Sequence, residues 1–321
     1  MEKDQDSRGG TRIRVKDQTK VSIVVFSPSG NTLEVGRMLE EHLSTKGVDV
    51  QLLDATGDKT LFREREFSRF LTENVRPHDV LCVGGPVYAH HMHYSVLDLI
   101  KALPDPGNGW GKYAVPFVTY GTVSSGIALE DAAKLLRKTG RSPVFAMKID
   151  AYHCYSRIFP TEVNVGMPGD EAIPFIEDLS ARIASLEDQQ KAECQDVTRE
   201  LRYLSFVDRA KAKVLIREGL FQRHIYPDLR FDTDKCVQCG KCADVCPVLR
   251  LDMAETGPCI PKGAPQCIHC GSCIAACPSD AIAFKTNMER WGNIFRKALS
   301  GRSPLASNES PKSAVYPLLR R

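Results

Sequence analysis

Eight of the twelve cysteines fall into two groups with identical spacing. The first group reads CVQCGKCADVCP from Cys236, and the second reads CIHCGSCIAACP from Cys267. In the pattern CxxCxxCxxxCP, three sulfurs on one tight turn can bind three corners of an iron–sulfur cubane, and the fourth sulfur reaches a second cluster. The spacing therefore predicts two 4Fe-4S clusters with exchanged ligands: Cys236, Cys239, Cys242 and Cys277 for the first, and Cys267, Cys270, Cys273 and Cys246 for the second.

Two zinc sites are the alternative for these eight cysteines, because CxxC pairs also bind zinc. Zinc needs four ligands per site and no Cys-Pro terminus, so two seven-residue cysteine triplets, each with a distal Cys-Pro, favour iron–sulfur chemistry. Gly240 and Gly271 hold matching places between the second and third ligands, where a side chain would crowd a cluster or block positive φ. Of the other cysteines, Cys82 is interpreted as a core residue and Cys259 as part of a hairpin.

A second candidate site lies near the N-terminus, where the apolar run VSIVVF leads through SPSGNT into a helical pattern. Ser27, Ser29, Gly30, Asn31 and Thr32 offer hydroxyl, amide and backbone N–H donors at a helix start, all of them neutral. Such a loop can hold one terminal phosphate dianion without a cation. The chain has no GxxxxGK[ST] loop and no GxGxxG after this strand, which argues against ATP and dinucleotides.

The elements that must position this loop alternate strictly between strand and helix from Val21 to about Leu186. Five apolar runs are each followed by a helical pattern: VSIVVF, VDVQLL, DVLCVG, YAVPFVT and PVFAMKI. The first helix carries Val35, Leu39 and Leu43 on one face, and Gly47 is placed to end it. This alternation predicts an α/β domain with a doubly wound parallel sheet.

The SPSGNT segment, with its strand and helix, resembles the phosphate loop of flavodoxins. The resemblance implies a flavodoxin-like five-stranded parallel sheet in the order 2-1-3-4-5, with FMN at the switch point between strands one and three. The second flavin loop of that family is similar to GGPVYAHHMH, with Pro86 and the candidate stacking residue Tyr88, and the third is similar to TYGTVSSG. The third loop contributes Tyr120, Gly121 and Gly126.

The sequence departs from many relatives in having His90, His91 and His93 directly after Tyr88. His90 or His91 could donate a hydrogen bond or a proton to a flavin. Exposed loop histidines are the plainer interpretation. A metal site on His90, Met92 and His93 is disfavoured, because adjacent residues rarely converge on one ion.

We divide the whole chain into five parts. Residues 1–20 are charged and predicted to be a disordered leader, 188–230 a helical connector, and 286–321 an amphipathic basic helix with a disordered tail. Residues 21–187 form the flavodoxin-like FMN domain that the resemblance implies. The two cysteine motifs resemble those of two-cluster ferredoxins, which implies a small α+β ferredoxin domain over 231–285. The ferredoxin domain is too small to fold on apolar burial alone, so cluster binding must stabilise it. The basic helix is expected to pack on the protein, with weak contact to a membrane surface as the alternative.

Composition sets broad limits on location and partners. The chain of 321 residues is 42% hydrophobic and has a net charge of +3. The segment from Lys285 onward contains eight Lys or Arg and only two Glu, so it is basic. No apolar run approaches the length of a membrane span, and no secretion signal precedes the cysteines. These features favour a reducing cytoplasm, redox proteins as partners, and no nucleic acid.

From Val21 to Lys285 the chain resembles fused flavodoxin-like plus two-cluster ferredoxin proteins of bacteria and archaea. The resemblance implies an electron-transfer protein that relays electrons between FMN and two 4Fe-4S clusters. Two alternatives stay open: a flavin-dependent oxidoreductase acting on a small molecule such as a quinone, and a ferredoxin whose flavodoxin-like domain has lost flavin and serves as a docking module.

Overall fold

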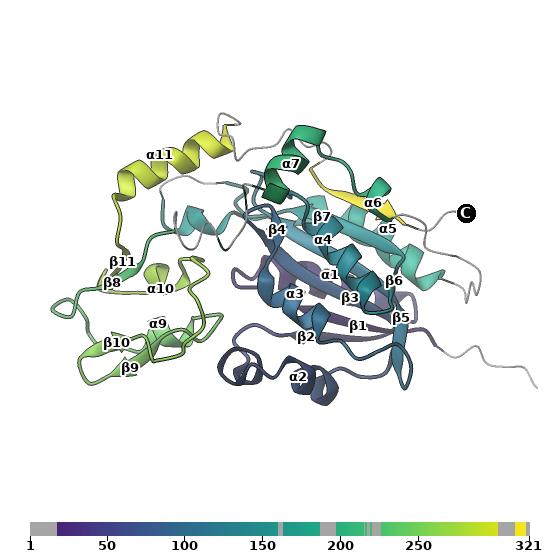
Figure 1. The fold of residues 1–321 in the computed structure, drawn as a ribbon, viewed down its shortest axis with the longest axis horizontal. Helices are drawn as coiled ribbons and strands as arrows, with labels where there is room; N and C mark the ends of the chain where they lie inside the picture. The colour runs from purple at the N-terminus through teal and green to yellow at the C-terminus, as the bar shows by residue number, and fades with distance from the viewer. Residues whose placement is uncertain are drawn as a thin grey trace, which may run out of the picture.

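The structure is a computed structural model that describes residues 18–159, 163–186, 197–214, 216, 219, 226–300 and 312–318. Most of the predicted leader, the polar boundary at 188–196 and residues 301–311 of the predicted tail lie outside the described residues. In Figure 1 the small domain lies beside the sheet of the large one.

The large domain is built on a parallel sheet of five strands, as predicted. The strands are β1 Lys20–Val25, β2 Asp49–Asp54, β3 His78–Tyr88, β5 Trp110–Tyr120 and β7 Phe145–Asp150. Their spatial order is β2-β1-β3-β5-β7, with parallel register throughout. The central strands are buried along most of their length, as in a sheet covered on both faces. This is the flavodoxin-like order, and its switch point lies between β1 and β3.

Helices cover both faces of the sheet. They are α1 Asn31–Thr45, α2 Phe67–Asn74, α3 Tyr94–Lys101, α4 Ala128–Lys138 and α5 Ile173–Ala184. Helices α1 and α5 share one apolar core, which contains Leu39 and Ile176. The other three helices share a second core, which contains Phe70, Val96 and Leu129. Single turns fill three connections: η1 Thr60–Glu64, η2 Cys154–Arg157 and η3 Asp170–Ala172.

The sheet has one strand that the sequence analysis missed. Strand β12, Ala314–Pro317, pairs antiparallel with β7 and forms an edge of the sheet. The prediction of a disordered tail is therefore wrong for these residues, although 319–321 lie outside the described part. Four residues ending in proline are too short to show a strand period, and the partner strand decides their structure. Two-residue strands β4 (His91–Met92) and β6 (Ser142–Pro143) pair with β3 and β5.

The connector packs onto the large domain as well as linking the two domains. Its described helices are α6 Val197–Glu200 and α7 Phe206–Val214. Leu201, Leu204 and Ile216 are buried. Arg209 on α7 donates to the buried carboxylate of Glu130 on α4, at 2.6 Å. The connector is thus anchored on the α4 side of the sheet.

The small domain consists of two pseudo-equivalent halves. Strand β8 (Leu229–Phe231) pairs with β11 (Ile282–Phe284), and the hairpin β9–β10 joins Asp252–Ala254 to Gly257–Cys259, which confirms the hairpin interpretation of Cys259. Each cysteine triplet ends in one helical turn, α9 (Lys241–Asp244) or α10 (Ser272–Ala275). These turns begin at Gly240 and Gly271, whose φ values of 76° and 75° explain the predicted glycines.

The last helix, α11 (Met288–Leu299), runs from the small domain back toward the large one (Figure 1). Its face is occupied by contacts with the protein, because Gly292, Phe295 and Ala298 are buried. The favoured expectation of packing is therefore met, and contact with a membrane surface stays a prediction. Among the described residues, no helix combines the length and the apolarity that crossing a membrane requires.

Candidate functional site

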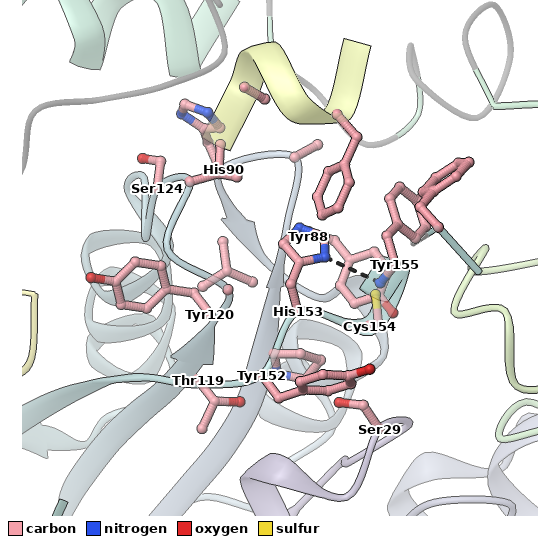
Figure 2. Close-up of a pocket in the computed structure, with 18 of the residues that line it drawn as sticks. Ser29, Tyr88, His90, Thr119, Tyr120, Ser124, Tyr152, His153, Cys154 and Tyr155 are labelled. Atoms are coloured by element: carbon pink, nitrogen blue, oxygen red, sulfur yellow. Dashed lines mark hydrogen bonds between the residues drawn. The ribbon is translucent and has the colours of Figure 1, made fainter. Parts of the chain in front are cut away.

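A cavity of about 590 Å³ opens at the carboxyl ends of the parallel strands. Its walls come from the segments that follow β1, β3, β5 and β7, and its roof comes from α11. Figure 2 shows Ser29 and Tyr152 at one end and His90 at the other. The volume falls in the range of roughly 300–1,000 Å³ that is usual for small-molecule pockets. Four separate segments therefore converge where open α/β sheets bind ligands.

Two residues of the SPSGNT loop, Ser29 and Asn31, line this pocket. The other predicted donors hold the loop in shape. The Ser27 hydroxyl accepts from the Leu33 amide at 2.9 Å, and the Thr32 hydroxyl shares a 2.7 Å hydrogen bond with that of Thr119. Gly30, with φ of 89°, makes the left-handed turn into α1. The loop thus has the conformation expected of a phosphate cradle at a helix N-terminus.

One cation that the sequence analysis did not identify lies beside this loop. Arg157, at the end of η2, donates from Nη2 to the Ser29 carbonyl at 2.7 Å. No motif in the sequence marks Arg157, because 128 positions separate it from Ser29 and only the tertiary fold brings it there.

The second predicted loop supplies Pro86 and Tyr88 to the pocket wall. Tyr88 is held edge-on against the His93 ring, with centroids 4.9 Å apart. Burial raises the pKa of Tyr88 well above its ordinary value, and the nearby thiols of Cys154 and Cys270 add to the rise. The phenol is therefore neutral, and Cys270 of the second motif is one of its electrostatic neighbours.

The three histidines of this segment have different environments. His90 is buried and lines the pocket, as expected for a residue near a flavin. His91 does not: its Nδ1 lies 2.5 Å from Asp131 Oδ2, and its Nε2 faces the carbonyl oxygens of Ala212 and Ile216. The structure thus turns His91 to the connector, and its proposed role as a proton donor is not supported.

Burial lowers the pKa of His91, but the hydrogen bond and charge of Asp131 outweigh it, so the net pKa is raised. His93 is fully buried and has its pKa lowered to about 3 by desolvation. It is a neutral core residue that caps α3 by accepting from the Ser95 amide.

In the third predicted loop the glycines leave room for neighbouring histidines, for the side chain at Gly121 and for the backbone at Gly126. A Cβ at Gly121 would stand 2.6 Å from His153, and one at Gly126 would stand 2.1 Å from the His90 carbonyl oxygen. Tyr120 borders the pocket, but its hydroxyl donates to the Lys312 carbonyl at 2.7 Å, and the side chain points away from Tyr88 in Figure 2. The predicted role of Tyr120 beside the ring is therefore not supported, because the C-terminal segment holds it.

Sequence reasoning missed the aromatic segment that follows β7. Tyr152, His153, Cys154 and Tyr155 all line the pocket, and the Tyr152 carbonyl accepts from Asn31 Nδ2 at 2.7 Å. Desolvation lowers the pKa of His153 to about 4, so this imidazole is neutral at pH 7, and its Nδ1 accepts from the Tyr155 amide. The available signal was the run AYHCY directly after the fifth strand, which belongs to the carboxyl edge of the sheet.

The roof of the pocket comes from α11, which the sequence analysis did not connect with the site. Phe295 packs edge-on against His153, with centroids 4.5 Å apart, and Trp291 lies 6.4 Å from the Tyr155 ring. Lys297 adds one cation to the lining. A segment on the far side of the ferredoxin domain in sequence thus closes a pocket of the flavodoxin-like domain.

The two cysteine motifs present matching local geometry. The amides of Gln238 and His269 approach Cys236 and Cys267 Sγ at 3.4 Å. A second matched pair involves the distal cysteines: the Arg250 amide approaches Cys246 Sγ at 3.2 Å, and the Ala281 amide approaches Cys277 Sγ at 3.3 Å. Such N–H···S contacts are the ones that tune iron–sulfur clusters.

The exchanged pairing of Cys246 is supported by electrostatics. Burial raises the pKa of Cys267 to about 11, and the thiols of Cys270 and Cys246 contribute to the rise. Cys246 also raises the pKa of Cys270 and Cys273, so it neighbours all three cysteines of the second triplet, whereas Cys242 of the first triplet contributes only at Cys273. Because ligands bind as thiolates, loading this site must release protons.

Among the described residues, which include all eight motif cysteines, no three Cys, His, Asp or Glu side chains are grouped to hold a single metal ion. The preference for iron–sulfur chemistry over zinc therefore rests on the cysteine spacing.

The second triplet lies against the pocket wall. Cys270 is 7% exposed and belongs to the apolar core of the large domain, together with Val248 and Ile268. Gly271 faces Ile158, whose Cδ1 would be 2.3 Å from an added Cβ. In contrast, Cys239 of the first triplet is exposed. The chain thus brings one candidate cluster next to the pocket and leaves the other toward solvent.

Comparison with known proteins assigns the small domain. Residues 228–278 match the family model described as a 4Fe-4S dicluster domain. No curated protein matches the chain.

Solved structures similar to the large domain include flavodoxins. One from the domain Archaea is 20% identical, covering 52% of this chain and 96% of that chain with a TM-score of 0.35. Megasphaera elsdenii flavodoxin is 22% identical, covering 51% and 98% with a TM-score of 0.34. The rubredoxin oxygen:oxidoreductase of Desulfovibrio gigas is 19% identical, covering 52% and 36% with a TM-score of 0.37.

The strand order and parallel register establish the flavodoxin-like fold independently of these scores. The chain therefore joins a flavodoxin-like domain to a 4Fe-4S dicluster domain. This architecture supports a role in electron transfer.

Proposed function

We propose that this protein relays electrons between FMN and two 4Fe-4S clusters. The observation that carries the proposal is the contact between the pocket and the second cysteine motif: Tyr226 lines the pocket and stacks on His269 of that motif, with ring centroids 4.4 Å apart. Bound FMN would exchange two electrons and each cluster one, which suits a relay between two-electron and one-electron partners.

The residues present fit these groups. Ser29 and Asn31 would hold the phosphate, and an apolar, aromatic lining with Pro86, Tyr88 and Tyr155 suits a planar ring. The Cys267, Cys270, Cys273 and Cys246 set would hold the cluster next to the pocket, and the Cys236, Cys239, Cys242 and Cys277 set would hold the outer one. Helix α11 would exclude water above the ring site.

A second candidate function is the reduction or oxidation of a small molecule such as a quinone. Its support is the pocket itself, which is closed by Phe295 and Trp291 and has His90 and neutral His153 in its lining. Either imidazole could hold a proton at this site. In this case the clusters would connect the pocket to an outside donor or acceptor.

Anaerobic purification followed by iron, sulfide and flavin analysis of one sample tests the relay. We expect about eight irons and one FMN per chain. Iron without recoverable or rebindable flavin would contradict both functions and favour the docking-module alternative. Gly30→Glu is the matched variant, because its carboxylate would repel the phosphate and remove FMN while the iron content stays unchanged. Quinone-dependent turnover by the loaded protein would favour the second candidate.

A further inference from the structure

Arg157 joins the two halves of the proposed relay. It lies at the end of η2, after the aromatic segment that lines the pocket. Its Nη2 donates to the Ser29 carbonyl at 2.7 Å, and its Nη1 donates to Ser272 Oγ at 3.4 Å. Ser29 belongs to the SPSGNT loop, and Ser272 is the first residue of α10. One guanidinium therefore spans the anion loop and the second cysteine motif.

Ser272 extends this connection to a cluster ligand. Ser272 is buried, with 8% of the residue exposed, and its hydroxyl lies 3.4 Å from Cys270 Sγ. The same hydroxyl donates to the Pro28 carbonyl, also at 3.4 Å. The Ser272 hydroxyl thus connects Cys270 to the SPSGNT loop in two ways. One is its own hydrogen bond to Pro28, and the other runs through Arg157 to Ser29.

The charge of Arg157 has consequences at both ends. A permanent cation beside a phosphate loop strengthens dianion binding, and a cation near a cluster favours the reduced, more negative form. When a dianion occupies the loop, it offsets the cation and weakens its effect on the cluster. Linkage requires the reverse effect of equal size, so reduction of the cluster weakens dianion binding.

We propose that Arg157 is a positioning residue that couples phosphate occupancy of the SPSGNT loop to the reduction potential of the cluster held by Cys267, Cys270, Cys273 and Cys246. The inference rests on the proposed function, since it takes FMN as the dianion. It adds that the same residue selects FMN over riboflavin, because only FMN carries the phosphate.

Arg157→Gln tests the coupling, and Arg63→Gln is its matched control. Arg63 also bridges the two domains, donating to Asp252 Oδ1 at 2.6 Å, but its partner lies on strand β9 and not in the SPSGNT loop. In Arg157→Gln we expect the FMN dissociation constant to rise about three- to tenfold, with little change for riboflavin. We also expect one cluster potential to become more negative while the other stays unchanged.

Three measurements complete the test: flavin titrations, cluster potentials by EPR-monitored redox titration, and the same potentials in flavin-stripped protein. Arg157→Lys should restore the cluster potential, because it restores the charge. The inference would be overturned if Arg157→Gln lost FMN and riboflavin affinity equally. It would also be overturned if Arg157→Gln shifted the reduction potentials of both clusters by the same amounts as Arg63→Gln.

The proposed function and the inference fail in different ways. If the unaltered protein binds no flavin, the function fails. The effect of Arg157 on one cluster can still be measured in that flavin-free protein, and an unchanged potential in Arg157→Gln would then sink the inference separately. In protein that does bind flavin, added salt should weaken FMN binding more than riboflavin binding, and an equal effect on both would contradict the role of the charge.

Discussion

The two cysteine motifs have the same spacing but differ in their surroundings at the second cysteine and the glycine after it. Cys239 in the first motif is exposed, whereas its counterpart Cys270 is buried against the large domain. A Cβ at Gly240 would meet nothing within 4 Å, whereas one at Gly271 would strike Ile158. The repeated pattern therefore sets the local backbone geometry of both motifs. Packing against the large domain sets which motif is buried and which is exposed.

The largest expected effect is a difference in flavin-to-cluster electron exchange between cysteine variants of the two motifs. Cys270→Ala and Cys239→Ala should each reduce the iron content from about eight to about four. Cys270→Ala should abolish electron exchange between flavin and the remaining cluster, because the site next to the pocket is lost. Cys239→Ala should leave exchange between flavin and the inner cluster intact. Anaerobic photoreduction followed by EPR measures this exchange in both variants.

Equal flavin content and far-UV circular dichroism would show that both cysteine variants keep the large domain folded. If Cys239→Ala blocked flavin-to-cluster exchange while Cys270→Ala did not, the assignment of inner and outer clusters would be reversed.

A smaller effect is expected from the matched glycines. Gly240→Ala and Gly271→Ala place the same side chain at nearly the same positive φ, so their backbone strain is similar, at about 1–3 kcal/mol. Gly271→Ala adds the overlap with Ile158, and overpacking of this kind costs about 1–3 kcal/mol more. Urea midpoints of the loaded proteins measure the difference.

The double variant Gly271→Ala/Ile158→Ala isolates the overlap. Removing the Ile158 branch should bring the urea midpoint back toward that of Gly240→Ala carrying the same Ile158→Ala change. Identical midpoints for the two single glycine variants would mean that the second motif is not packed against Ile158.

The smallest effect is expected at the ion pair that ties the hairpin after the first motif to the large domain. Arg63 and Asp252 are 2.6 Å apart, with side chains 30% and 50% exposed. Arg63→Ala should lower the free energy of unfolding by only about 0.2–1 kcal/mol, because exposed pairs are weak. Thermal unfolding at low and high salt measures it, with Arg76→Ala, whose partner Asp49 lies within the large domain, as the control.

A loss above about 2 kcal/mol in Arg63→Ala would show that the first motif is held to the large domain as firmly as the second. That result would break the contrast between a packed inner motif and a loosely tethered outer one.

The sequence alone predicted the local patterns correctly. Cysteine spacing indicated the cluster type, because three ligands of one cubane can come from one tight turn and the fourth from the other motif. The alternation of apolar runs indicated the parallel sheet. Gly240 and Gly271 were identified because positive φ restricts the residue type. The SPSGNT loop was found because a helix N-terminus with hydroxyl side chains has a recognisable local sequence.

Only the tertiary structure decided which residues meet across long separations. It placed Arg157 on Ser29, turned His91 from the pocket to the connector, and brought Phe295 against His153 in the pocket. It also selected the second motif as the inner one and added β12 to the sheet. Local sequence fixes backbone geometry and ligand type through short-range sterics and spacing. Long-range contacts depend on how whole elements pack, and no single segment records that information.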